Sequence, residues 1–385
     1  MHVVVVGGGF AGVKAALELS KRQVGKITLI SDEDYFLHHA TLYATATGKD
    51  YAESVIPLKD IFESHPAVTV VKDRMTSLDP TRRLVIGDVT QYHYDNLIIA
   101  VGSVTTYFGI EGMAEHSYGI KSLDEISKFH DHIHKEVVEK KLDKEYFVIG
   151  AGPTGIELAG ALNEHLKHLA KSNRLENSRA KVTLVEAAPR IAPRSSATAA
   201  KIISKRLKEQ GIRVLVNHKV NALDENGITI DGKKVETSTA VWTSGVGNNP
   251  FFKAHEHLFK LAPNGRVNVN PHLEAIPHVY VLGDNNTVKY SGMAWPAMHQ
   301  ATYVAKHLSR LVTKLPHGAY HPRSVMSGLP VGENWGYVEW LGLYVSGKTG
   351  YKVRRWMELH GYKQILPKAQ AIAIWRAHDI AEVDS

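Results

Sequence analysis

The 385-residue sequence contains no cysteine and no run of 18 consecutive apolar residues. The first absence excludes a disulfide, a thiolate nucleophile and a thiol redox pair within this chain, and it fits a reducing cytoplasm. The second excludes a helix that crosses a bilayer. The first expected strand begins at His2, which leaves no room for a signal peptide before it. A chain of this length is expected to fold into two or three domains.

Basic residues are unevenly distributed along the chain. Lysine and arginine number 46 against 39 aspartates and glutamates, a net charge of +7. Between Ser346 and Arg376 there are seven basic residues and one acidic residue, Glu358, which makes that stretch +6 by itself. The basic character therefore belongs to the C-terminus, and its seven basic residues are Lys348, Lys352, Arg354, Arg355, Lys363, Lys368 and Arg376.

Two glycine-rich turns carry the main signal. The first, Gly7–Gly12, reads GGGFAG and follows the apolar run Val3–Val6; the second, Gly150–Gly155, reads GAGPTG and follows Tyr146–Ile149. Each opens a helical pattern. In such a turn the first glycine permits the bend, the second lets the backbone approach a pyrophosphate, and the third lets the helix pack on the strand. Two such turns predict two dinucleotides, most simply a flavin and a nicotinamide.

Acidic residues near these turns sharpen the prediction. Glu186 ends the strand expected at Lys181–Glu186, where an acid binds ribose hydroxyls. In the first unit Ser31 takes that place, with Asp32 beside it. Far downstream Asp284 directly follows an apolar strand and Gly283, where it suits a flavin's ribityl chain, although the residue type also suits a helix cap.

The order of these motifs, together with the segments Tyr35–Gly48 and Gly152–Leu162, resembles the two-dinucleotide flavoprotein superfamily and, within it, the type II NADH dehydrogenases. The resemblance implies an α/β fold with two Rossmann-like dinucleotide-binding domains, for FAD and NADH, and a C-terminal amphipathic extension that faces the membrane. The implied domains are residues 1–115 (FAD, first part), 116–250 (NADH), 251–320 (FAD, second part) and 321–385 (membrane association or dimerisation).

The resemblance also implies the site residues. Glu157 would lie at the contact between flavin and nicotinamide, although an acid also suits a helix's first turns. Trp295, His299 and Gln300 would contact a quinone, because Trp295 and His299 stand where the family has glutamines. Flavin contacts would be Gly7, Gly9, Phe10, Ala11, Gly12, Ser31, Asp32, His39, Met75, Ala100, Gly102, Gly283, Asp284 and Ala294. NADH contacts would be Gly150, Gly152, Pro153, Thr154, Gly155, Glu186 and Gly245.

The implied activity is NADH:quinone oxidoreduction through FAD, without proton pumping. Two alternatives stay open: a soluble NADH-dependent reductase of a ferredoxin or rubredoxin, and an NADH-binding redox sensor similar to apoptosis-inducing factor.

The C-terminal stretch contains a possible amphipathic helix. Val353, Trp356, Met357 and His360 would share one face, with charged residues around the rest. A basic helix with aromatic residues is typical of a membrane-surface element, and a stripe that packs on the protein or on a second copy in a homodimer is the alternative. We expect a peripheral location on the cytoplasmic face of a membrane, and no nucleic-acid partner because no such motif is present.

Histidine spacing does not favour a metal. His130 and His134 would share a helix face, as paired ligands do, but the stretch around them is polar and typical of an exposed helix. We therefore expect no metal site.

Overall fold

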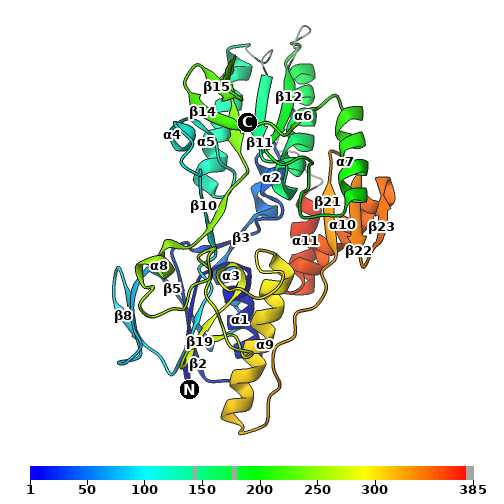
Figure 1. Cartoon of the computed structure of the whole chain (residues 1–385). Coiled ribbons are helices and arrows are strands. Elements are labelled where there is room, and N and C mark those ends of the chain that lie inside the picture. The colour runs from blue at the N-terminus through cyan, green and yellow to red at the C-terminus, as the bar shows by residue number, and fades with distance from the viewer. Residues whose placement is uncertain (141, 143–144, 176–179, 379–385) are drawn as a thin grey trace.

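The computed structural model describes residues 1–140, 142, 145–175 and 180–378. They form two nucleotide-binding units, one above the other in Figure 1, with a C-terminal region beside their junction. The end of the predicted C-terminal domain, residues 379–385, lies outside the described part. Within that part, no helix is long and apolar enough to cross a membrane.

The first unit is built on a six-stranded sheet in which five strands run parallel and one edge strand is antiparallel. The strand order is β19 (Glu274–Ile276), β20 (Val279–Val281), β9 (Asn96–Ile99), β1 (His2–Val6), β2 (Lys26–Ser31) and β5 (Val68–Lys72), with β19 antiparallel at the edge. Helices α1 (Phe10–Lys21) and α9 (Ala294–Val312) lie against each other on one face. The other face carries the antiparallel strands β6 (Met75–Asp79), β7 (Leu84–Gly87) and β8 (Gln91–His93).

The four consecutive valines of β1 explain this layering. Val3 and Val5 are buried among the helices, whereas Val4 and Val6 are buried toward the β6–β8 side. Side chains alternate along a strand, so a strand covered on both faces is apolar at every position.

The second unit repeats this plan. Its parallel sheet has the order β13 (Arg213–Val216), β12 (Lys181–Glu186), β11 (Glu145–Ile149) and β17 (Ala240–Trp242). Helices α5 (Leu123–Val138), α6 (Pro153–Ser172) and α7 (Ala197–Glu209) pack on one face. The antiparallel strands β14 (Val220–Asp224), β15 (Gly227–Ile230) and β16 (Lys233–Glu236) cover the other.

Two antiparallel strands connect the units, β10 (Ser103–Thr105) and β18 (Val246–Asn248). The chain leaves the first unit along β10 and returns along β18, so the second unit is inserted into the first. Short elements complete both units: β3 (Tyr35–Leu37), α2 (Leu42–Thr45), η1 (Tyr51–Glu53), β4 (Val55–Pro57), α3 (Leu58–Phe62), α4 (Met113–His116), α8 (Pro250–Ala254) and η2 (Gly283–Asn285).

The C-terminal region is a small α+β layer rather than an isolated amphipathic tail. It contains β21 (Ser327–Pro330), β22 (Gly336–Trp340), β23 (Leu343–Ser346), α10 (Gly347–Tyr362) and α11 (Lys368–Ala377). The region contacts α6 and α7 of the second unit and η1 of the first. It packs into the hydrophobic core of the first unit through Tyr362, Ile365, Leu366 and Ala371. Polar contacts add to this packing: the Tyr362 hydroxyl donates to the Glu53 carbonyl, and His378 Nδ1 lies 2.8 Å from a Glu53 carboxylate oxygen.

Candidate functional site

A cleft of about 740 Å³ opens where the first unit, the second glycine turn and the C-terminal region meet. Its lining includes every predicted flavin contact except Gly12, namely Gly7, Gly9, Phe10, Ala11, Ser31, Asp32, His39, Met75, Ala100, Gly102, Gly283, Asp284 and Ala294. Gly12 lies behind the turn, where an added Cβ would come 1.8 Å from the Gly7 carbonyl oxygen. The absence of a side chain at Gly12 therefore allows α1 to pack closely on the end of β1.

The two glycine turns have nearly the same geometry. Gly7 and Gly150 adopt φ of +114° and +105°, where residues with a side chain are strained. An added Cβ on Gly155 would come 1.8 Å from the Gly150 carbonyl oxygen. This is the same distance as between an added Cβ on Gly12 and the Gly7 carbonyl oxygen. Gly9 and Gly152 differ from these, because an added Cβ would meet no atom within 4 Å.

Gly9 and Gly152 are also the N-caps of α1 and α6, and neither helix start has a side-chain cap. Each turn therefore presents unpaired backbone N–H groups and space beside a helix N-terminus, which fits a pyrophosphate.

The turn after β20 is held firmly in place. The Gly283 N–H donates to the Gln300 side chain at 2.8 Å, and Asn285 exchanges two hydrogen bonds with the Gly102 backbone, at 3.0 and 2.7 Å. The Asp284 carboxylate accepts a hydrogen bond from Ser103 at 2.9 Å and lines the cleft. Asp284 is not a helix cap, because it lies inside the short η2 turn. Its carboxylate is positioned to accept hydroxyl hydrogen bonds from a ligand in the cleft.

In the second unit the Glu186 carboxylate lies beside the glycine turn, where it accepts from the backbone N–H groups of Ala151 and Ala188 at 2.7 and 2.8 Å. Only Pro153, Thr154 and Glu157 of this unit's predicted residues reach the shared cleft. Gly245 lies at the junction between the units, where its carbonyl accepts from the Lys121 ammonium at 3.3 Å. The remaining predicted residues, Gly150, Gly152, Gly155 and Glu186, lie outside the cleft's lining.

Glu157 is part of a buried group of charges. Burial raises the pKa of its carboxyl to about 8, although the Arg354 guanidinium, 3.9 Å away, opposes that rise. Arg354 also pairs with Glu358 at 2.8 Å, and Glu358 accepts a second bond from Arg355 at 2.5 Å. Glu157, Arg354 and Glu358 all line the cleft. A neutral Glu157 can donate a proton in a hydrogen bond where the two units meet.

This group of charges corrects the prediction for the C-terminal helix. Arg354, Arg355 and Glu358, expected around an exposed polar face, are only 6%, 6% and 3% exposed. The buried side of α10 is thus charged, because the two arginines are neutralised inside the protein. Of the predicted apolar face, Met357 lines the cleft and Trp356 is exposed. Two of the seven basic residues are therefore unavailable to a membrane surface.

The three residues predicted to contact a quinone separate in the structure. Trp295 lines the cleft, and its ring stacks on His360 at 5.2 Å, which in turn stacks on exposed Trp356 at 5.5 Å. His299 lies outside the lining and its Nδ1 is 3.2 Å from the Tyr320 hydroxyl. Gln300 is fully buried, since its amide oxygen supports the Gly283 turn. Gln300 thus acts on the cleft through the backbone rather than by contact.

Sequence reasoning missed several cleft residues: Lys121, Met326, Ser327, Arg354, Met357 and Glu358. Lys121 lies three residues after the β-bridge of Tyr118 and outside every motif of the sequence, so no pattern indicated it. Burial lowers the pKa of its ammonium group. The charge pattern of Arg354 and Glu358 gave a misleading signal, because their spacing also fits a solvated face.

The region around His130 and His134 contains no metal cluster among the residues described. Between them His132 Nε2 contacts the Thr239 hydroxyl at 2.7 Å and Glu136 at 3.2 Å. One group of possible metal ligands does occur elsewhere in the described chain, at His272, His307 and His317.

Comparison with known proteins identifies the family. Residues 1–302 match the family of pyridine nucleotide-disulphide oxidoreductases. The type II NADH:quinone oxidoreductase Ndh of Mycobacterium tuberculosis is 32% identical over 330 residues, which cover 79% of this chain and 71% of that protein. The chain belongs to the type II NADH:quinone oxidoreductases. The resemblance inferred from the sequence is thereby confirmed. Unlike the disulphide enzymes that give the larger family its name, this chain has no cysteine.

Further type II NADH:quinone oxidoreductases and solved structures agree with this assignment. A type II NADH:quinone oxidoreductase of Staphylococcus epidermidis is 29% identical over 334 residues, 80% of this chain and 82% of that protein. NDH2 from Plasmodium falciparum, solved with RYL-552, superposes with a TM-score of 0.85 at 15% identity, covering 99% of this chain and 98% of that one. The sulfide:quinone oxidoreductase of Aquifex aeolicus gives 0.80 at 18% identity, covering 100% and 93%. These likenesses confirm the predicted α/β fold with two dinucleotide-binding domains.

Proposed function

We propose that this protein is an FAD-dependent NADH:quinone oxidoreductase that does not pump protons. The observation that carries the proposal is the meeting of two dinucleotide turns at one cleft, with Glu157 of the second unit lining the space formed mainly by the first. Bound FAD would supply the chemistry, accepting hydride from NADH and delivering two electrons to a quinone.

The chain's own residues would bind, orient and exclude water. The N–H groups at the Gly9 turn would hold the flavin's pyrophosphate, and Asp284 would accept hydrogen bonds from its ribityl chain. The Gly152 turn and Glu186 would bind NADH from the side of the second unit. Met357 and Glu358 would close the cleft from the C-terminal region, which raises the strength of every polar interaction inside it.

Glu157 and Trp295 would act nearest the reaction. A carboxyl kept neutral by burial can donate a hydrogen bond to a carbonyl or hydroxyl oxygen at the junction of the two units, and Arg354 holds it in place. Trp295 offers an aromatic face on the cleft's lining, and its stack with His360 and Trp356 leads from the cleft to the surface. This stack suits the approach of a flat quinone ring.

An absorbance trace tests the activity. The purified protein should be yellow, NADH should bleach the flavin band anaerobically, and a soluble quinone analogue should restore it with repeated turnover. Restoration by a ferredoxin or rubredoxin alone would favour the soluble reductase. Bleaching without turnover on any acceptor would favour the redox sensor. A colourless protein that neither binds added FAD nor gains stability from it would contradict both.

We also propose that the enzyme binds peripherally to the cytoplasmic face of a membrane through its C-terminal region. The support is a surface that the sequence did not single out: the tip of the β22–β23 hairpin, where Leu341 and Leu343 are 70% and 77% exposed. Trp340, Tyr344 and Trp356 are also exposed, as are Lys348 and Lys352. Exposed aromatic and aliphatic side chains beside lysines are typical of a surface that inserts into lipid headgroups.

Vesicle sedimentation tests the membrane proposal. The protein should bind vesicles that contain anionic lipid and leave them as salt rises, because screening weakens the attraction. Leu341→Asp with Leu343→Asp should abolish binding while NADH still bleaches the flavin. Loss of a dimer in that variant, with vesicle binding unchanged, would assign the surface to the homodimer instead.

A further inference from the structure

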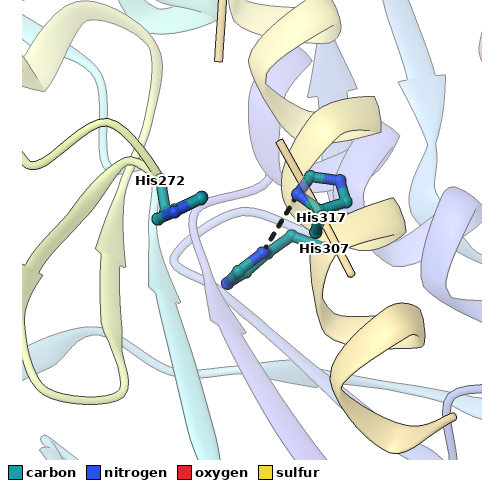
Figure 2. Close-up of side chains that lie close together, drawn as sticks. All are labelled: His272, His307 and His317. Atoms are coloured by element: carbon teal, nitrogen blue, oxygen red, sulfur yellow. Dashed lines mark hydrogen bonds between the residues drawn. The ribbon is translucent and has the colours of Figure 1, made fainter. Parts of the chain in front are cut away.

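Three histidines from separate parts of the chain meet at the edge of the first unit, away from the cleft. His272 lies in the turn before β19, His307 on α9, and His317 in the segment that leads from α9 toward β21 (Figure 2). One ring nitrogen from each lies within 4.8 Å of one from each of the others. None of the three lines the cleft, so the dinucleotide chemistry does not use them.

The closest pair already has the spacing of two metal ligands. The Nδ1 atoms of His307 and His317 are 3.2 Å apart, joined in the structure by a hydrogen bond. Two nitrogens bound at about 2.0–2.1 Å to a tetrahedral ion lie about 3.3 Å apart. A metal ion can therefore replace the shared proton with a small rotation of either ring.

Neighbouring groups fix the tautomer of the third histidine, His272. The Tyr303 hydroxyl donates its proton to the Gly318 carbonyl at 2.7 Å, so the contact of 2.7 Å between Tyr303 and His272 Nδ1 must use the proton of the histidine. That tautomer leaves the lone pair of His272 Nε2 free. Metal-binding histidines commonly have their second nitrogen fixed in this way by a polar neighbour.

The charge state of the cluster also suits a cation. Burial lowers the pKa of His307 to about 4 and lowers that of His317. The negative charge of Glu274 raises the pKa of His307 and so favours a cation there, although its carboxylate oxygens accept hydrogen bonds from the Asn270 side chain and the His278 N–H. Lys306 and Arg310 oppose it, although the Arg310 guanidinium is bound to the Pro316 carbonyl at 2.7 Å.

We propose that His272, His307 and His317 form a binding site for Zn²⁺ or a similar divalent transition metal ion, with water at the fourth position. The His272 and His307 rings are stacked 4.8 Å apart and only 15° from parallel, so half-buried His272 tilts out of the stack to bind, pivoting on the hydrogen bond between its Nδ1 and Tyr303. The ion ties the segment after α9 to the turn before β19. His130 and His134, the spacing noticed in the sequence, have no part in it.

Calorimetry on the chelator-treated, FAD-loaded full chain tests the site with Zn²⁺ alone as the probe. We expect one Zn²⁺ per chain and, at about 100-fold excess of Zn²⁺ over Kd, a rise in Tm of about 3 °C. His317→Ala should weaken binding by at least about 100-fold. His321→Ala is the matched control, because His321 is exposed four residues further along the same segment, and it should bind as the wild type does.

A second readout needs no variant. Co²⁺ bound at a tetrahedral site absorbs intensely at wavelengths beyond the flavin band, and Zn²⁺ should displace that signal stoichiometrically. The proposal is overturned if Zn²⁺ does not saturate at one site, if His317→Ala and His321→Ala bind alike, or if Co²⁺ gives only the weak spectrum of the hydrated ion. The three rings would then be a hydrogen-bonded packing contact.

Discussion

The two nucleotide-binding units share a turn geometry but differ in what covers it. The first turn lies at one wall of a cleft that Met357, Glu358 and Gly361 help to close. In the second, Pro153 and Thr154 are exposed, and only the α6 end reaches the cleft. A glycine turn that the chain covers therefore suits a dinucleotide that stays bound. The same turn left uncovered suits a dinucleotide that exchanges. The cover, rather than the fingerprint, distinguishes the two roles.

The cover of the first turn is the part of α10 that contains Met357, Glu358 and Gly361. Weakening the attachment of this cover should have the largest effect on the stability of the protein. Arg354→Met removes one of the two arginines that pair with buried Glu358, and Arg355 remains as the other. Removal of one partner of a buried ion pair costs about 3–5 kcal/mol, so the loss of stability should reach at most that size. The free energy of unfolding in urea, with FAD bound, measures this. Lys352→Met on the exposed side of α10 is the control and should change stability by less than about 0.5 kcal/mol. Equal stability of the two variants would mean that the buried charges do not hold the cover.

Substituting the two open glycines should separate the two units. At Gly9 and Gly152 an added Cβ meets no protein atom within 4 Å, so Gly9→Val and Gly152→Val should fold but obstruct a dinucleotide. Overpacking of about 3 kcal/mol weakens binding by roughly 100-fold. Gly9→Val should lose FAD on gel filtration. Gly152→Val should stay yellow and resist bleaching by NADH, and loss of FAD in this variant would reverse the assignment of the two turns.

The contrast between the units also shows what the sequence can predict. Both sheets, the crossover helices and the inserted second unit follow from local patterns: glycines that need φ > 0, and apolar runs buried on both faces. The cover does not, because it depends on contacts between residues far apart in the chain. The spacing of Arg354 and Glu358 also fits the exposed face of a helix, and only their burial and their ion pair at 2.8 Å show that they neutralise each other inside the protein. The role of Gln300 could not be read from the sequence for a similar reason, because it depends on the hydrogen bond between its side chain and the turn at Gly283.

Glu157 lies at the contact between the units, and Glu157→Gln should remove the pH dependence that its carboxyl gives to stability and to kcat. The folded protein keeps Glu157 protonated up to about pH 8, whereas the unfolded chain releases that proton near the ordinary glutamate pKa of 4.5. Wild-type stability should therefore fall as pH rises from 4.5 to 8, and Glu157→Gln should become progressively more stable relative to it over that window. A step near pH 8 in kcat should vanish, and kcat below that step should change by less than about tenfold, because a glutamine amide can still donate the hydrogen bond. Parallel profiles for both proteins would remove Glu157 from the proposed site.

The smallest expected effect concerns the choice of donor at the uncovered turn. Glu186 can bond both ribose hydroxyls of NADH, whereas a 2′-phosphate would meet its negative charge. The Arg190 guanidinium is held by the carbonyls of Ala192, Pro193, Ser195 and Ser196, so its terminal N–H donors are already used and are not free to bind a 2′-phosphate. The ratio of kcat/KM for NADH to that for NADPH should therefore exceed one, and Glu186→Ala should reduce it by about tenfold, roughly 1.4 kcal/mol. Arg190→Ala should leave the ratio unchanged. If it falls in Arg190→Ala instead, the loop around Arg190 rather than the carboxylate sets the preference, and if wild type prefers NADPH the role of Glu186 is wrong.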